Sequence, residues 1–327
     1  MSFFAAHKET MTGKDIDKAA DFLHHNEVIG IPTETVYGLA GNAFSEDAVL
    51  KIFEVKQRPH FDPLIVHTYS LKSVESFVKH IPEAPVRLFN KFSPGPITLL
   101  LPKNDKIPDL VTSGLENVAV RIPNHPLTLS LLKKLPFPLA APSANPFGYI
   151  SPTSAQHVEK QLGDKIPYIL DGGECEVGIE STIVGFENGK TIVYRLGGLS
   201  VDDLENVCGK VEVRQSSSKP AAPGMLESHY APRKPMYIGT IEMLLAKHKD
   251  KKVAILSFSK IYEAYRCLNL SPKGDMKEAC KNIFKYMRLL DESDCEIIIA
   301  EFVPDVGLGK AINDRLKRAG ILDLSPV

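Results

Sequence analysis

Glu-Val-Ile-Gly-Ile-Pro (residues 27–32) is a short apolar run that ends at a proline, and it predicts a buried strand near the start of the chain. A helix is predicted after it, because Ser45 can act as an N-cap and apolar residues recur at helical spacing as far as Lys56. Pro59 ends that helix, since the residue before a proline avoids helical geometry. A strand that leads into a helix in this way is the building unit of an α/β fold.

Strand and helix patterns continue to alternate as far as residue 196. The predicted strands lie at 64–67, 97–101, 118–122, 139–141, 167–170, 181–186 and 191–196. The predicted helices lie at 71–80, 83–92, 126–134 and 153–162. Asn188-Gly189 between the last two strands is a hairpin signal, which makes that strand pair antiparallel. We therefore predict an α/β domain in which helices cover a mixed sheet.

The composition changes after residue 210, where a segment rich in Ser and Pro at 215–224 is typical of a linker. A second α/β pattern follows, with strands at 236–239, 252–257 and 296–301 and helices at 241–248, 275–290 and 306–318. Because 327 residues exceed the usual size of one hydrophobic core, we expect two domains. We place the first at 12–208, a linker at 209–235 and the second at 236–327.

The composition is that of an ordinary soluble globular protein, with 43% hydrophobic and 24% charged residues. A net charge of −1 argues against a broad nucleic-acid-binding surface, although it leaves room for a local basic cleft. The five cysteines are scattered and form no CxxC pair, so we expect neither a zinc site nor a disulfide framework. There is no signal-peptide pattern, and no apolar run approaches the roughly 18 residues that span a bilayer. We expect a cytoplasmic protein without membrane contact.

Two cations, Lys56 and Arg58, lie at the end of the first predicted helix and in the loop after it. They can be solvated charges that favour the helix dipole, or a clamp for phosphate or carboxylate groups. The stiff loop between Pro59 and Pro63 favours the clamp, because it holds the side chains at a lower entropic cost. The sequence contains no GxxxxGK[ST] motif, so a nucleotide would bind here without a P-loop.

Polar side chains at predicted strand ends are the next candidates for a ligand site. Thr33, Thr35 and Tyr37 follow the first strand, where they either cap a turn or meet a ligand at the edge of the sheet. Arg121 and Arg195 fall in predicted strands, where they are either exposed on an edge or directed inward at an anion.

Three further features are ambiguous in the same way. Pro-Ser-Ala-Asn-Pro (142–146) is either a plain loop or a place of close approach to a ligand. A lone histidine such as His67 is more often structural than functional. The segment 223–232 contains His229 and Tyr230, which a spacer does not need, so we expect it to pack over the mouth of the first domain.

A series of short motifs occurs in a fixed order along the chain. They are Pro-Thr-Glu-Thr-Val-Tyr-Gly-Leu (32–39), Lys-Gln-Arg-Pro (56–59), Pro-Leu (63–64), Ser-Pro-Gly-Pro-Ile-Thr (93–98), Val-Arg-Ile-Pro (120–123), Ala-Pro-Ser-Ala-Asn (141–145), Ser-Thr-Ile-Val (181–184) and His-Tyr-Ala-Pro (229–232). In this order they resemble the threonylcarbamoyl-AMP synthases of the long, two-domain Sua5 type, whose first domain is YrdC-like. The resemblance covers roughly residues 12–232, and the second domain matches in size and position only.

The resemblance implies an open, twisted mixed sheet with a large concave cavity, followed by a small Rossmann-like α/β domain, with the linker folded over the cavity. It implies a nucleotidyltransferase that joins L-threonine, bicarbonate (or CO2) and ATP into threonylcarbamoyl-AMP and releases diphosphate, with Mg2+ beside ATP. The product feeds the N6-threonylcarbamoyl modification of adenosine 37 in tRNA. The implied partners are the downstream tRNA threonylcarbamoyltransferase machinery and, weakly, tRNA.

The resemblance also implies roles for individual residues. Lys56 and Arg58 would be catalytic, and no residue is implied as a dedicated metal ligand. The implied ATP-binding residues are Lys56, Arg58, Asp62, Asn117, Ser143, Ser151, Arg195 and Tyr230. The implied L-threonine-binding residues are Thr35, His67, Arg121, Ala141 and Ser181, with Arg121 paired to the substrate carboxylate and His67 a candidate general base. Asp62 stands where many relatives carry Asn; it could accept hydrogen bonds or help to hold Mg2+, but it adds negative charge beside ATP.

Two other functions stay open. One is an RNA-binding module in tRNA or ribosome maturation without ATP chemistry, which the near-neutral net charge disfavours. The other is carbamoyl transfer in metallocentre maturation, where related domains lie in larger proteins. The absence of clustered cysteines, and so of a zinc-finger segment, disfavours that role.

Overall fold

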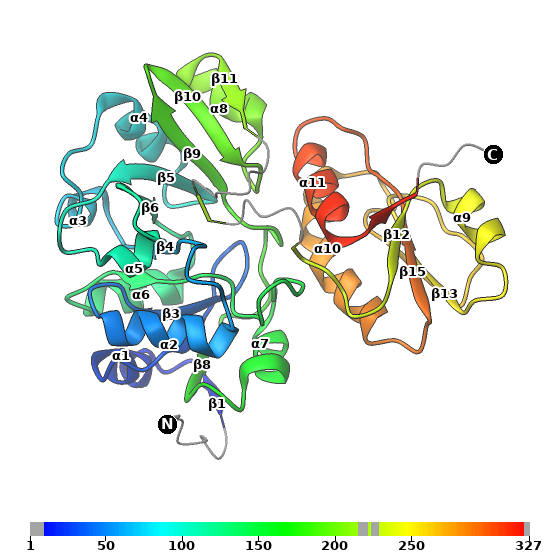
Figure 1. Ribbon diagram of the computed structural model, residues 1–327, viewed down its shortest axis with the longest axis horizontal. Coiled ribbons are helices and arrows are strands. Elements are labelled where there is room, and N and C mark those ends of the chain that lie inside the picture. The colour runs from blue at the N-terminus through cyan, green and yellow to red at the C-terminus, as the bar shows by residue number, and fades with distance from the viewer. Residues whose placement is uncertain (1–9, 215–221, 224–228, 324–327) are drawn as a thin grey trace.

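The computed structural model describes residues 10–214, 222–223 and 229–323, which form two α/β units of different size (Figure 1). Residues 215–221 and 224–228 of the predicted linker, and residues 324–327 at the end of the predicted second domain, lie outside the described residues. Two units are what the length and the change in composition predict.

The larger unit is built on an eleven-stranded mixed sheet. Its strands are β1 (Met11–Gly13), β2 (Ile29–Ile31), β3 (Gly38–Asn42), β4 (Ile65–His67), β5 (Ile97–Pro102), β6 (Asn117–Arg121), β7 (Leu139–Ala140), β8 (Tyr168–Leu170), β9 (Thr182–Glu187), β10 (Lys190–Arg195) and β11 (Val211–Val213). Across the sheet the order is β1-β8-β2-β3-β7-β4-β6-β5-β9-β10-β11. In the centre, β4 pairs in parallel with β6, and this register places His67 beside Arg121. The topology therefore brings together two candidate residues that are far apart in the sequence.

The helices of the larger unit cover this sheet, and their ends follow local sequence signals. They are α1 (Ile16–His24), α2 (Glu46–Lys56), α3 (Leu71–Val74), α4 (Glu83–Phe92), α5 (Asp109–Thr112), α6 (Pro126–Lys134), α7 (Ala155–Leu162) and α8 (Val201–Cys208). Ser45 caps α2 as predicted, since its hydroxyl accepts a hydrogen bond from the Ala48 N–H at 3.3 Å. α2 ends at Gln57, whose left-handed backbone (φ 54°) directs the chain away from the helix axis. This turn carries Arg58 toward the sheet.

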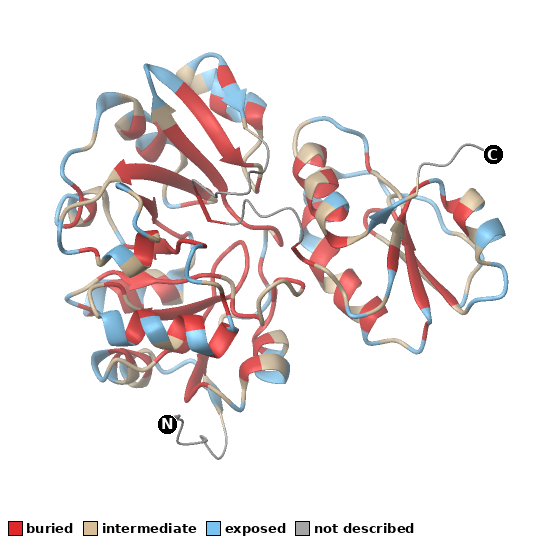
Figure 2. Ribbon diagram, in the orientation of Figure 1, coloured by how far each residue is buried: buried red, intermediate tan, exposed pale blue. Residues whose placement is uncertain are grey.

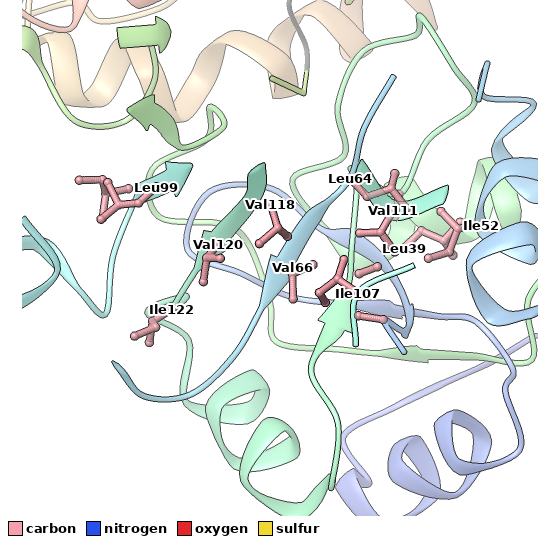
Figure 3. Close-up of a cluster of buried hydrophobic side chains, with 14 of the residues drawn as sticks. Leu39, Ile52, Leu64, Val66, Leu99, Ile107, Val111, Val118, Val120 and Ile122 are labelled. Carbon is pink, nitrogen blue, oxygen red and sulfur yellow. The ribbon is translucent and has the colours of Figure 1, made fainter. Parts of the chain in front are cut away.

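Strands and helices of the larger unit share one large apolar core (Figure 3). Val66 of β4 and Val120 of β6 are fully buried at its centre, and Ile52 of α2 and Val111 of α5 belong to the same cluster. The strands are buried along most of their length, whereas the outer faces of the helices are exposed (Figure 2). Burial of such side chains stabilises the fold by about 1.5–3 kcal/mol each.

The smaller unit has a parallel sheet of five strands, which confirms the predicted Rossmann-like second domain. Its strands are β12 (Met236–Ile238), β13 (Val253–Ser257), β14 (Arg266–Asn269), β15 (Ile297–Ala300) and β16 (Ile321–Leu322), and their order is β14-β13-β15-β12-β16. Its helices are α9 (Ile241–Lys247), α10 (Met276–Asp291) and α11 (Gly309–Ala319). α10 and α11 lie toward the larger unit, and α9 lies at the far end (Figure 1).

Buried polar contacts join the two units. Arg288 of α10 donates hydrogen bonds to the carbonyl oxygens of Ile150 and Ser151 in the larger unit, the latter at 3.2 Å. Tyr149 Oη donates to Asp291 Oδ2 at 2.6 Å. Arg288 is fully buried, so these contacts are shielded from water.

Gly178 of the larger unit lies directly against the backbone of α10. Its φ is +80°, and a Cβ built on it would stand 2.5 Å from the carbonyl oxygen of Cys280 and 2.5 Å from Lys281 Cα. Real Cβ atoms do not approach backbone so closely. A glycine at this position is therefore required for the two units to pack as they do.

Several elements of the structure were not predicted: the strands β1, β3, β11, β14 and β16 and the helices α1, α5 and α8. β3 (Gly38–Asn42) was not predicted, because its Gly-Leu-Ala-Gly-Asn sequence has a low strand propensity; it forms because β2 and β7 pair with it on both sides. The helix predicted at 71–80 ends at Val74, because the chain turns to bury Phe77 in the core. By contrast, the hairpin at Asn188-Gly189 is confirmed, with both residues at positive φ. None of the described helices combines the length and the hydrophobicity that a bilayer crossing requires.

Candidate active site

A cavity lies in the larger unit beside the ends of β2, β4, β6, β7 and β10. Cationic, hydroxyl and apolar side chains line it together. The lining residues are Thr33, Val36, Tyr37, Gly38, Arg58, Pro63, Ile65, His67, Arg121, Ala141, Pro142, Ser143, Glu180, Arg195, Pro223, His229 and Tyr230. This combination suits an anionic ligand with polar edges.

Lys56 and Arg58 are buried, with 1% and 8% of their surface exposed, so their interpretation as solvated charges is wrong. Lys56 Nζ donates hydrogen bonds to the carbonyl oxygens of Ser143 and Asn145. Burial, and then the charge of Arg58, hold the pKa of Lys56 well below its usual value. An anion in the cavity would favour the charged form of Lys56.

Asp62 is the partner of Arg58. Its Oδ2 lies 2.9 Å from Arg58 Nη2, and Arg58 also donates to the carbonyl oxygens of Asp62 (3.0 Å) and Pro63 (2.9 Å). Asp62 is fully buried and does not line the cavity. Its negative charge is therefore directed at Arg58, which it holds in place.

Arg121 lines the cavity at the end of β6, an inner strand, and is buried, so the expectation that it could be exposed on an edge strand is wrong. Its Nη2 lies 2.8 Å from Glu34 Oε1, and Glu34 Oε2 accepts a hydrogen bond from the Asn124 N–H at 3.0 Å. Arg121 Nε is buried and donates to no residue that the structure describes. This guanidinium is held by one carboxylate and keeps donor capacity for another.

His67 stands next to Arg121 at the end of β4. Burial, and then the charge of Arg121, lower the pKa of His67 to about 3. The imidazole is therefore neutral at pH 7, and a group with so low a pKa is a weak base. The environment of His67 disfavours its use as a general base.

The hydroxyl groups after β2 bond mainly to one another and to the backbone. Thr33 Oγ1 lies 2.8 Å from Thr35 Oγ1 and donates to the carbonyl oxygen of Val36 at 2.6 Å. Tyr37 Oη donates to the carbonyl oxygen of Gly173 at 2.7 Å. These contacts shape the turn, while Thr33 and Tyr37 still present surface to the cavity.

Arg195 is directed inward from the end of β10. Its Nε and Nη2 donate to the carbonyl oxygen of Ser181 at 3.1 and 3.0 Å, and Nη2 also donates to Ser181 Oγ at 3.1 Å. Burial lowers the pKa of Arg195 to about 10, so the group stays charged at neutral pH. Ser181 thus orients Arg195, and Thr98 Oγ1 lies 2.7 Å from Ser181 Oγ.

A carboxylate that the sequence analysis did not single out, Glu180, connects the cavity to the second unit. Ser151 Oγ donates to Glu180 Oε1 at 2.6 Å, and Arg315 Nε of α11 donates to Glu180 Oε2 at 3.1 Å. Glu180 and Arg315 were missed because their pairing depends on how the two units pack. The Glu-Ser pair at 180–181 was the one local signal that could have drawn attention to Glu180.

Tyr230 is buried at the cavity and has a left-handed backbone, with φ of 68°. Its ring stacks on Phe284 of α10, with centroids 5.3 Å apart, and packs edge-on against His229, with centroids 4.2 Å apart. Tyr230, His229 and Pro223 all line the cavity. Residues that connect the two units therefore form part of its wall.

Most of the predicted site residues gather here, either in the lining or in contact with it. Lys56, Asp62, Thr35, Ser151 and Ser181 each bond to a lining residue. Asn117 is the exception, because it is exposed at the opposite end of β6 from Arg121. Within the described residues, no three His, Cys, Asp or Glu side chains converge to hold a metal ion.

The fold and the cavity define a class of protein: a two-unit α/β protein whose cavity is lined by buried arginines and, in part, by Pro223, His229 and Tyr230 of the segment between the units. Comparison with known proteins identifies the family within this class. Residues 21–197 match the Sua5/YciO/YrdC family model, described as "Telomere recombination", and residues 199–320 match the model "Threonylcarbamoyl-AMP synthase, C-terminal domain".

Full-length relatives agree with these matches. The chain is 40% identical to a threonylcarbamoyl-AMP synthase of Pyrococcus abyssi, over 92% of each chain. It is 39% identical to the Bacillus subtilis protein of the same name, over 93% of this chain and 92% of that one. The crystal structure of P. abyssi Sua5 complexed with L-threonine superposes with a TM-score of 0.90 at 38% identity, over 95% of this chain and 97% of that one. The chain belongs to the threonylcarbamoyl-AMP synthase family of the Sua5 type, as the motifs predicted.

Proposed function

We propose that this enzyme is a nucleotidyltransferase that converts L-threonine, bicarbonate (or CO2) and ATP into threonylcarbamoyl-AMP and diphosphate. This would be the first step of N6-threonylcarbamoyladenosine formation at position 37 of tRNA. The observation that carries the proposal is one cavity lined by three buried arginines: Arg58 and Arg195 lie near Tyr230, and Arg121 pairs with Glu34. The names of the full-length relatives support it.

We assign ATP to the side of the cavity that holds Arg58, Arg195 and Ser143. Tyr230 also lines this cavity, Lys56 and Asp62 contact Ser143 and Arg58, and Ser151 bonds to Glu180 of the lining. Buried guanidinium groups bind phosphate strongly, because water does not compete with the ligand. Asn117 is kept as a proposed ATP residue on the resemblance alone, since it lies away from the cavity.

We assign L-threonine to the side that holds Arg121, His67 and Ala141, with Thr35 and Ser181 behind the lining. Arg121 would pair with the substrate carboxylate through donor capacity that Glu34 leaves unused. The P. abyssi relative, whose crystal structure is complexed with L-threonine, supports L-threonine as a ligand. Glu34 then acts as the residue that fixes the orientation of Arg121.

The chemistry fits such a site. The neutral amine of threonine attacks CO2 and gives an N-carboxylate with loss of a proton. A carboxylate oxygen then attacks the α-phosphorus of ATP, and the bond to diphosphate breaks. Negative charge grows on the phosphoryl oxygens, so the enzyme has to supply positioned cations rather than a nucleophile of its own.

Mg2+ would enter with the triphosphate, because such ions are commonly held by substrate phosphates and only one or two protein groups. The described residues contain no cluster that could serve as a dedicated site, and Asp62 is engaged by Arg58. Bound in this way, Mg2+ would neutralise the departing diphosphate.

We further propose that the chain divides into a catalytic part at 12–208, a connecting segment at 209–235 that closes over the cavity and a second domain from 236. β11 of that segment pairs with the first sheet. Downstream, a tRNA threonylcarbamoyltransferase would consume the product.

The test is diphosphate release by the purified chain with ATP and Mg2+, with threonine or bicarbonate omitted in turn. Release should require both. Arg121→Lys should raise KM for L-threonine more than KM for ATP, Arg58→Ala should do the reverse, and Arg87→Ala, which removes an exposed charge, should match the wild type. Wild-type kinetics in both site variants would refute the assignment. Salt-dependent RNA binding without diphosphate release would instead support the RNA-binding alternative.

A further inference from the structure

Two arginines of α11, Arg315 and Arg318, reach the wall of the cavity from the second unit. The guanidinium carbon of Arg315 lies 5.2 Å, and that of Arg318 5.0 Å, from the centre of the Tyr230 ring. The backbone N–H of His229 donates to the carbonyl oxygen of Arg318 at 3.1 Å. α11 is thus fixed directly behind two residues of the cavity lining.

Both arginines keep hydrogen-bond donors that no described residue uses. The Arg318 side chain is 9% exposed; its Nη1 lies 3.4 Å from Asp314 Oδ2, whereas Nε and Nη2 are buried and donate to nothing that the structure describes. Arg315 pairs with Glu180 and Asp314, and its Nη2 is buried and donates to no residue that the structure describes. A buried charged donor without an acceptor is costly, so these nitrogen atoms suit an anion from outside the chain.

Charge balance around Tyr230 indicates the same kind of ligand. The cluster contains four arginines, Arg58, Arg195, Arg315 and Arg318, and three carboxylates, those of Asp62, Glu180 and Asp314. Burial, and then the charges of Arg318 and Arg58, hold the pKa of His229 well below its usual value, so its ring is neutral and adds no charge to the cluster. An excess of buried cations favours a ligand with more than one negative charge.

We propose that Arg318, assisted by Arg315, binds the diphosphate portion of the nucleoside triphosphate, so that the second unit completes the nucleotide site. The inference deepens the proposed function and rests on it for the identity of the nucleotide. Arg195 lines the cavity from the first unit, and a triphosphate that contacts both Arg195 and Arg318 bridges the two units. Tyr230 lines the cavity and its ring lies against both α11 guanidinium groups, so the proposal requires this ring to shift for the phosphates to reach them.

The test uses the full chain and measures binding by calorimetry. Arg318→Ala, Arg318→Lys and the control Lys317→Ala, which removes an exposed charge from the same helix, are titrated with inorganic diphosphate, ATP, AMP and L-threonine. Arg318→Ala should weaken inorganic diphosphate and ATP by about ten- to a hundredfold, since a charged hydrogen bond is lost. AMP and L-threonine should bind as in the wild type, Arg318→Lys should recover part of the loss, and Lys317→Ala should show none.

Unchanged affinity for inorganic diphosphate in Arg318→Ala overturns the inference. An equal loss for AMP and L-threonine also overturns it, because Arg318 would then only maintain the fold. Failure of the proposed function has a different signature: the wild type would bind inorganic diphosphate but form no product from ATP, L-threonine and bicarbonate.

Discussion

Replacement of Gly178 by alanine should force the two units apart. The substitution has two costs: a left-handed backbone disfavours alanine by about 1–2 kcal/mol, and a clash with packed backbone typically costs about 1–3 kcal/mol more. The clash is severe here, because the new Cβ would stand 2.5 Å from both the Cys280 carbonyl oxygen and Lys281 Cα of α10. Gly173 is a matched control, since its φ is +82° and a Cβ there would meet nothing within 4 Å.

Both variants can be compared by urea denaturation and by ATP binding. Gly173→Ala should lose about 1–2 kcal/mol of unfolding free energy, from backbone strain alone. Gly178→Ala should lose about 1–3 kcal/mol more than this control and should bind ATP more weakly, because α10 and α11 move away from Tyr230. Equal stability and equal ATP affinity in the two variants would show that the units do not pack through Gly178.

Two further predictions concern buried groups. Arg288→Met should destabilise the protein by about 2–5 kcal/mol, because two buried carbonyl groups lose their hydrogen-bond donor. Urea denaturation measures the loss, with the exposed Arg87→Met as the control. A loss of unfolding free energy below about 1 kcal/mol would contradict the prediction. Burial and Arg121 hold the pKa of His67 at about 3 in the folded protein, whereas its pKa in the unfolded chain is near 6.5. Between these two pH values the unfolded chain binds a proton that the folded protein does not bind. Stability should therefore fall on acidification by up to about 1.4 kcal/mol per pH unit for this residue. His67→Asn should show a shallower loss between about pH 6 and 4. The exposed control His80→Asn should follow the wild type, and identical slopes in all three proteins would refute the argument.

Patterns with a local physical cause were predictable. The N-cap at Ser45, the hairpin at Asn188-Gly189 and the succession of strands and helices depend on a few neighbouring residues, and the structure confirms them. β3 was missed because its stability comes from its neighbours in the sheet, not from its own glycine-rich sequence.

Candidate residues were easier to choose than their partners. Arg121 and Arg195 could be selected because a charge in a predicted strand needs an explanation, and Arg58 because it follows a helix end beside a loop stiffened by prolines. Their partners Asp62, Glu34 and Ser181 are set by tertiary packing, and only the first lies close in sequence to the residue it pairs with. Arg315 and Arg318 had no local signal at all, since two arginines on an amphipathic helix are usually solvated.

The contact between Glu180 and Arg315 limits which sequence changes such a chain can accept during evolution. Replacement of Arg315 alone, with the second unit in place, would leave the Glu180 carboxylate buried beside Ser151 without this partner, and removal of one partner of a buried pair costs about 3–5 kcal/mol. A recombination between distant lineages that changed only one of the two positions would carry this cost. We therefore expect the two positions to be inherited together, although they lie in different halves of the chain.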